Sequence, residues 1–424
     1  MNIVISKTKR IYWPVVAFLL VQTIISNEMF WALGLLTVCC YIFIMNSRKI
    51  FLPFSEYKIL FVFLAWGILL GLIALSRGTN SYVDLVRDIF YFSNPIIFMY
   101  LGASYAKEKI SIFKIFNAFI ITSGFLSIVQ LFNILLNVSA LSSAFTVQGW
   151  RNITGDGGVV IAISLAIVFA GIIPKGMRLP RILGIILVLV NVAYFILSLS
   201  RTNIMIISIM YAVLLLEKGN SKIILMRIVG VIALVFLCLF VLNFVLPSEI
   251  SSSFTKKMLS SLTEVNASNS WNSPYEIQSN WRGYETYCAV NQWKDSNFIH
   301  QIFGAGFGER IYVGRYAYTL LKQVDSTGQA INSIAVLHNG YATMLIKLGV
   351  LGVIGYLLFY FAIIKKAWKA HKRTDSLDSR ILLAMGLIFL IQTYFLNGLM
   401  KDYCFFPMII LIGYSAYNIQ YKRL

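Results

Sequence analysis

Charged residues are scarce in this 424-residue chain. Asp, Glu, Lys and Arg make up only 12% of it, whereas 58% is apolar and the mean hydropathy is +0.77. A soluble domain carries about 25% charged residues, because its whole surface faces water. The shortage of charge therefore excludes a soluble enzyme and a disordered chain, and it predicts an all-α polytopic membrane protein.

Residues that build metal sites and disulfide frameworks are also few. The chain has five cysteines and three histidines, and no CxxC pair. His300 and His338 lack carboxylate or thiolate neighbours at the spacing of metal ligands. We therefore expect no metal, no cofactor and no disulfide framework, and the sequence alone does not assemble a Ser-His-Asp triad.

Long apolar segments fill most of the chain instead. A membrane-spanning helix needs about 20 mostly apolar residues. By this measure the sequence predicts twelve spans: 11–26, 29–46, 58–76, 88–106, 112–138, 157–174, 180–199, 202–217, 222–247, 338–364, 380–398 and 402–420.

The distribution of positive charge predicts how these spans are oriented. Of 36 Lys and Arg residues, most fall in every second loop, where acidic residues are few. Because basic loops stay on the cytoplasmic side, both termini are expected in the cytoplasm. The net charge of +19 is thereby explained by orientation and by contact with membrane lipids, and nucleic acid is not an expected partner.

One loop is much longer than the others and divides the chain into three parts. Residues 1–247 are predicted to hold spans one to nine, and 338–424 spans ten to twelve. Between them, 248–337 forms a large outer, periplasmic loop with short helices. Its segment 281–293 has helical periodicity.

Charged residues at the outer ends of spans are candidates for function, because charge at membrane depth usually faces a cavity and a partner. Arg201 lies in a very short hairpin between two apolar spans, where it could bind a phosphate or reach the lipid headgroups. For Arg282 alone, a surface salt bridge with Glu285 or Glu276 is favoured, and Arg87 beside Asp84 and Asp88 has the same alternative. Arg151 precedes a Gly-rich turn, 155–158, that opens a helix N-terminus and could receive an anion, although such turns are common before membrane helices. His338, at the start of the tenth span, could accept a proton near neutral pH or cap its helix.

Several of these residues stand in motifs that resemble the O-antigen ligase/polymerase superfamily. The motifs are SRT at 200–202, an Arg282-containing helix, GAGFG at 304–308, HNGY at 338–341 and KLGVLG at 347–352. Their order, the number of spans and the large outer loop also agree with that family.

The resemblance implies a glycosyltransferase that takes its glycan from undecaprenyl pyrophosphate at the periplasmic face of the bacterial inner membrane. It implies catalytic roles for Arg201, Arg282 and His338. Further substrate contacts are expected from five residues: Arg87, Arg151, Asn339, Tyr341 and Lys347. A lipid-linked acceptor, and a protein that regulates chain length, are the other partners it suggests.

Three functions remain open at this stage. Ligases of the family often carry Arg-x-x-x-Leu at the hairpin, and here Met205 stands in the leucine position. We therefore favour a polymerase that joins repeat units over a ligase that transfers glycan to lipid A-core. A flippase of the same lipid-linked substrate is the third candidate, but transporters usually show repeat symmetry, which this chain lacks.

Overall fold

The structure is an all-α membrane protein with one short hairpin of strands. The computed structural model describes residues 34, 36–42, 51–137, 147–155, 158–172, 181–216, 229–230, 240, 252, 255, 271, 273–314, 316, 332–400 and 406–421. Its helices are α3 (Tyr57–Ser76), α4 (Tyr82–Lys107), α5 (Ile112–Leu136), α7 (Val147–Thr154), α8 (Val159–Phe169), α9 (Arg181–Leu197), α10 (Arg201–Leu214), α13 (Pro274–Ser279), α14 (Trp281–Asp295), α15 (Phe298–Phe303), α17 (Gly340–Thr374), α18 (Leu377–Phe395) and α19 (Phe406–Tyr421). Strands β1 (Ile311–Tyr312) and β2 (Ser333–Ile334) pair antiparallel.

Helices occupy most of the spans that the sequence predicts. Within the described residues, α3, α5, α17 and α18 are long and apolar enough to cross a membrane, while α8, α9 and α10 are shorter apolar helices. The predicted span 11–26 lies outside the described residues, as does most of 29–46 and 222–247. The periodic segment 281–293 is confirmed as α14.

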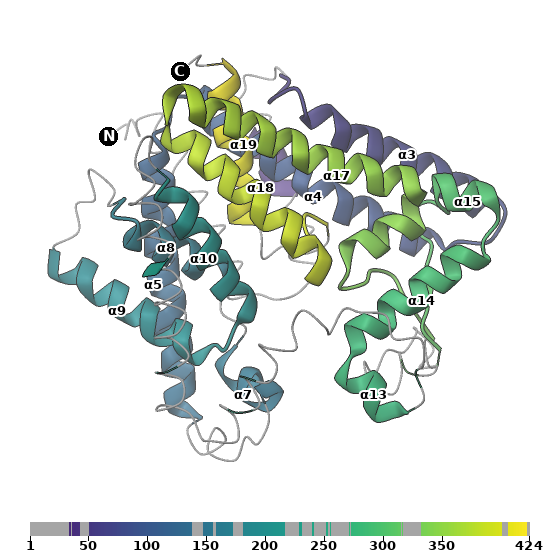
Figure 1. Ribbon diagram of the computed structural model, residues 1–424, viewed down its shortest axis with the longest axis horizontal. Helices are drawn as coiled ribbons and strands as arrows, with labels where there is room; N and C mark the ends of the chain where they lie inside the picture. The colour runs from purple at the N-terminus through teal and green to yellow at the C-terminus, as the bar shows by residue number, and fades with distance from the viewer. Residues whose placement is uncertain are drawn as a thin grey trace, which may run out of the picture.

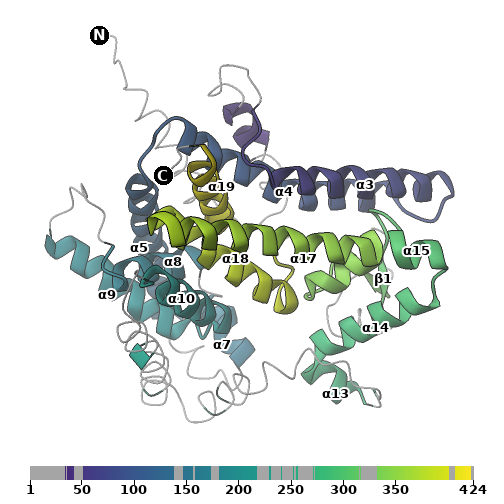
Figure 2. The same ribbon diagram turned by 45° about the horizontal axis from the view of Figure 1, so that its top comes forward.

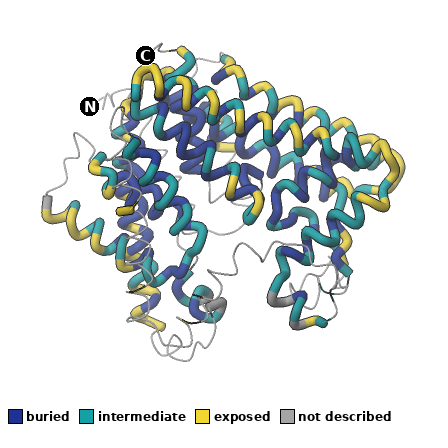
Figure 3. Tube along the Cα trace, in the orientation of Figure 1, coloured by how far each residue is buried: buried dark blue, intermediate teal, exposed yellow. Residues whose placement is uncertain are grey.

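Two groups of helices meet at α18. Helix α18 packs on α10 on one side and on α17 and α19 on the other, and α19 lies along α4 (Figures 1 and 2). Helices α5, α8, α9 and α10 form the first group, and α3, α4, α17 and α19 the second. Buried residues are concentrated along α4, α18 and α19, whereas α3 and α17 expose their outer sides (Figure 3).

Helix α17 is broken near its N-terminus, inside an apolar run that the sequence predicts as one span. Gly349 has φ 66° and ψ −169°, a conformation that removes the helical donors for the carbonyl groups just before it. The carbonyls of Ile346 and Lys347 are the two affected. They accept hydrogen bonds instead from the backbone N–H groups of Ala305 and Gly306, at 2.9 Å each.

The segment that supplies these donors, 304–308, inserts between α3, α4 and α17. Phe307 is fully buried, its backbone N–H donates to the carbonyl of Gly67 in the middle of α3 at 3.0 Å, and its ring packs on that of Phe92. Although 248–337 is predicted as an outer loop, this part of it packs against the membrane-spanning helix α3. Irregular backbone is tolerated at such depth only where protein surrounds and pairs it.

Gly306 gives a test of this insertion. Its φ is +89°, and a Cβ atom there would collide with the backbone of α3 at Leu70 and Gly71. Gly78 has a similar φ of +70° but nothing within 4 Å, so Gly78→Ala reports the cost of the backbone conformation alone, about 1–2 kcal/mol. We expect Gly306→Ala to lower the thermal unfolding midpoint of the detergent-purified protein well below that of Gly78→Ala. Equal midpoints would contradict the insertion.

Candidate functional site

His338 and Glu285 form the centre of the candidate site. Nδ1 of His338 lies 2.9 Å from Oε2 of Glu285, and the backbone N–H of His338 donates to the same oxygen at 3.0 Å. Glu285 is buried, with 1% of its surface exposed, whereas the His338 side chain is 40% exposed. One buried carboxylate therefore fixes both the backbone and the ring of a half-exposed histidine.

This contact also determines which ring nitrogen can react. An ionised carboxylate only accepts hydrogen bonds, so Nδ1 of His338 carries the proton that lies between them. In the neutral ring the lone pair is then on Nε2, to which no described residue is hydrogen-bonded. The arrangement is that of a general base oriented by a carboxylate.

Arg282 stands one helical turn before Glu285 on α14. Residues three and four apart share a helix face, so Arg282, Glu285 and Thr286 point to the same side. The Thr286 hydroxyl donates to the carbonyl of Arg282 at 2.9 Å and accepts from the Asn339 amide at 3.4 Å. The structure thus places His338 against the turn of α14 that also carries Arg282.

Arg201 and Arg151 form a second cluster. Arg201 is the first residue of α10, whose N-cap is Ser200. Arg151, on α7, donates from Nη2 to the carbonyl of Leu199, and the Trp150 indole donates to the carbonyl of Leu197 at 2.8 Å. Helix α7 therefore contacts the hairpin that precedes Arg201, and Nη2 of the Arg151 guanidinium makes one of these contacts.

The Arg201 cluster and His338 lie at the same end of the helix bundle. Arg380, near the start of α18, donates to the carbonyl of Leu214 at the end of α10 at 2.8 Å, so the two helices run in opposite directions. The start of α10 is therefore on the side where α18 ends. There Asn397, just after α18, packs against Gly340 at the start of α17.

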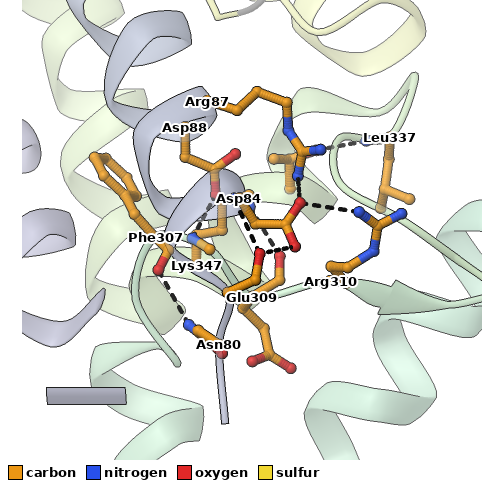
Figure 4. Close-up of polar contacts among 12 residues, drawn as sticks. Asn80, Asp84, Arg87, Asp88, Phe307, Glu309, Arg310, Leu337 and Lys347 are labelled. Atoms are coloured by element: carbon orange, nitrogen blue, oxygen red, sulfur yellow. Dashed lines mark hydrogen bonds and ion pairs between the residues drawn. The ribbon is translucent and has the colours of Figure 1, made fainter. Parts of the chain in front are cut away.

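A third group of charges surrounds Asp84 near the N-terminus of α4. One carboxylate oxygen of Asp84 forms an ion pair with Arg87 and accepts a hydrogen bond from Arg310 at 2.9 Å, and the other accepts from the Ser81 hydroxyl at 2.6 Å. The Arg87 side chain points toward Leu337, the residue before His338 (Figure 4). The side chains of Arg87 and Arg310 are each about one quarter exposed.

Lys347 does not face open space. Its ammonium and the Asp88 carboxylate are both fully buried and form an ion pair, and Nζ also donates to the carbonyl of Glu309 at 2.9 Å. The Asp88 carboxylate accepts in addition from the backbone N–H of Gly308 at 2.7 Å. The substrate contact expected of Lys347 is corrected accordingly: the side chain joins α17 to α4 and to the inserted segment 304–308.

Asn339 and Tyr341 also make contacts within the fold. The Asn339 side chain caps α17 by accepting from the backbone N–H groups of Tyr341 and Ala342, and Asn339 is 4% exposed. The Tyr341 hydroxyl donates to the carbonyl of Leu390 at 2.8 Å. The substrate roles expected of these two residues remain predictions.

Cys288 is the one other group on α14 that could act as a nucleophile near Glu285. Burial raises the pKa of its thiol to about 11; a hydrogen bond with Tyr284 opposes this rise and the nearby Glu285 charge adds to it. The thiol is therefore protonated at neutral pH and unreactive. Among the described residues, no group of three or more His, Cys, Asp or Glu side chains is arranged to hold a metal ion.

No protein-family model and no curated protein matches the chain. The candidate site is therefore defined by its geometry and by the motifs of the sequence.

Lys347 offers a direct test of the buried ion pair. Lys347→Met leaves the Asp88 carboxylate buried without a cation, which we expect to cost about 3–5 kcal/mol of folding stability. Lys366→Met is the matched control, because Lys366 lies on the same helix and pairs with Glu56 at 2.8 Å where both side chains are partly exposed. That change should cost about 1 kcal/mol or less. Denaturant unfolding in detergent measures both; equal losses would contradict the role of the buried pair.

Proposed function

We propose that the chain is a membrane-embedded glycosyltransferase, an O-antigen polymerase that joins oligosaccharide repeat units carried on undecaprenyl pyrophosphate. The observation that carries the proposal is the half-exposed His338 ring, oriented by buried Glu285 and close to Arg282. The proposal places the chain in the bacterial inner membrane with twelve spans, both termini in the cytoplasm and the site at the periplasmic face. The basic residues of α17 beyond its apolar part support that orientation, because they lie at the end opposite His338.

The proposed reaction is a direct displacement at the anomeric carbon of the donor. An acceptor hydroxyl attacks that carbon while Nε2 of His338 takes its proton. The bond between the anomeric carbon and the pyrophosphate oxygen breaks, and the bonding electrons leave with the pyrophosphate. A single displacement of this kind inverts the configuration of the anomeric carbon.

Arginines are suited to the leaving group. A guanidinium donates two parallel hydrogen bonds to phosphate oxygens and keeps its charge at all physiological pH values. We assign this role to Arg201 and Arg282, which would stabilise the negative charge that develops on the pyrophosphate. Arg87 and Arg151 are additional cations in this proposal, and both also make contacts within the protein.

The function is tested by the lipopolysaccharide of a strain that lacks the gene for this chain. We expect that strain to show core with a single repeat unit, and the wild-type gene to restore the long ladder. His338→Ala should leave the single-repeat phenotype, because general-base catalysis contributes about 10²–10⁴-fold in rate. Glu285→Gln should reduce the ladder less completely, since the histidine remains but is poorly oriented. Equal expression must be shown by immunoblot.

Other outcomes of that experiment would replace the proposal. Bare core with long glycan accumulating on the lipid carrier identifies a ligase. Loss of all outer-side glycan identifies a flippase. A full ladder in the His338→Ala strain removes the general base from the mechanism.

Arg201→Lys and Arg282→Lys test the pyrophosphate contacts. Lysine keeps the charge but cannot donate two parallel hydrogen bonds, so we expect a tenfold or greater loss of polymer at equal expression, consistent with about 1.5–3 kcal/mol for a charged hydrogen bond. Arg373→Lys, on the exposed far end of α17, is the control and should leave the ladder unchanged. Wild-type ladders from the Arg201 and Arg282 variants would instead indicate headgroup or structural roles.

A further inference from the structure

Helix α15 carries two large apolar side chains on its surface. Phe298 is 74% exposed and Ile299 is 63% exposed, although both belong to a segment between polar loops. The residues just before them, Lys294, Asp295 and Asn297, are also exposed. The chain therefore changes from a charged to an apolar surface within a few residues, which is typical of a segment entering the interface of a bilayer.

Contacts with α3 give the position of α15 along the bundle. The Trp66 indole donates to the carbonyl of Phe303 at 3.0 Å, and the two rings lie 5.4 Å apart. Trp66 is ten residues from the outer end of the 20-residue helix α3, or about 15 Å along its axis. The end of α15 is thus beside the middle of a helix that is long enough only to cross the membrane once.

The surfaces on either side of α15 are apolar and exposed. On α3, Leu69 and Ile73 are 57% and 41% exposed, and they follow Trp66 on one helical stripe. On α17, against which α15 packs, a second exposed apolar stripe runs from Leu351 to Leu358. Phe298 and Ile299 continue the apolar surface of these two membrane helices.

We propose that α15 is a re-entrant helix whose Phe298 and Ile299 side chains contact the acyl chains of the bilayer leaflet on the His338 side. In this proposal α15 enters the leaflet after α14 ends. The segment 304–308 that follows α15 is hydrogen-bonded to the carbonyl groups of α17 just before its break. This placement does not depend on the glycosyltransferase function, because it rests on exposure and on contacts with α3 and α17.

Site-directed spin labelling in liposomes tests the placement. Single-cysteine variants Phe298→Cys and Ile299→Cys are made in the full-length chain after its five native cysteines are replaced by serine. Leu69→Cys on α3 is the lipid reference. Thr374→Cys, exposed at the charged end of α17, is the water reference. Accessibility is measured to oxygen, which concentrates in lipid, and to a polar nickel chelate, which stays in water.

We expect the oxygen-to-nickel ratio at 298 and 299 to match that of Leu69 and to exceed that of Thr374 several-fold. A ratio equal to that of Thr374 would place α15 in water and overturn the proposal. Low accessibility to both reagents would mean that a second protein copy covers the helix, which also overturns it. If one variant does not fold, the other still gives the answer, because the two positions are labelled independently.

Discussion

A break in a membrane helix has to be paired by other parts of the protein, and in this chain the pairing is made by the segment 304–308, which follows α15. At Gly349 two carbonyl groups of α17 lose their helical donors, and the N–H groups of Ala305 and Gly306 replace them. No water is available in the hydrocarbon region to do the same, so an unpaired carbonyl there would cost several kcal/mol. The break and the inserted segment therefore depend on each other.

The pairing has a consequence for the site, because it determines the direction of the first nine residues of α17. This half-helix begins directly after His338 and Asn339, and its N-terminus meets α14 at Glu285 and Thr286. The buried pair of Lys347 and Asp88 ties the other end of the half-helix to α4. The position of the His338 ring is thus fixed from both ends of a short rigid element, which suits the role of general base proposed for it.

Sequence reasoning could predict the helices but not the break between them. Hydropathy identified most described spans, because a run of apolar residues reports membrane depth directly. Gly349 looks like any glycine of a membrane helix, and only its contacts with 302–306 show that the helix stops there.

The role of Glu285 was equally hard to predict. Glu285 is 53 residues from His338 in the sequence, and the nearby Arg282 suggested a surface ion pair instead. Lys347 was misread because a lysine at membrane depth usually signals function, whereas its partner Asp88 is 259 residues away.

The charged side chains that stabilise the fold are buried, whereas those that can contact a substrate are partly exposed. Lys347 and Asp88 are fully buried and paired with each other, so transferring either to a ligand would leave a buried charge unpaired. Arg87 and Arg310 share a single carboxylate and keep about a quarter of their side-chain surface open, and His338 keeps more. Two guanidinium groups on one carboxylate leave an excess of positive charge on the protein surface beside Leu337. A diphosphate that approached His338 would meet this excess: one arginine can turn to the ligand while the Asp84 carboxylate keeps its ion pair with the other.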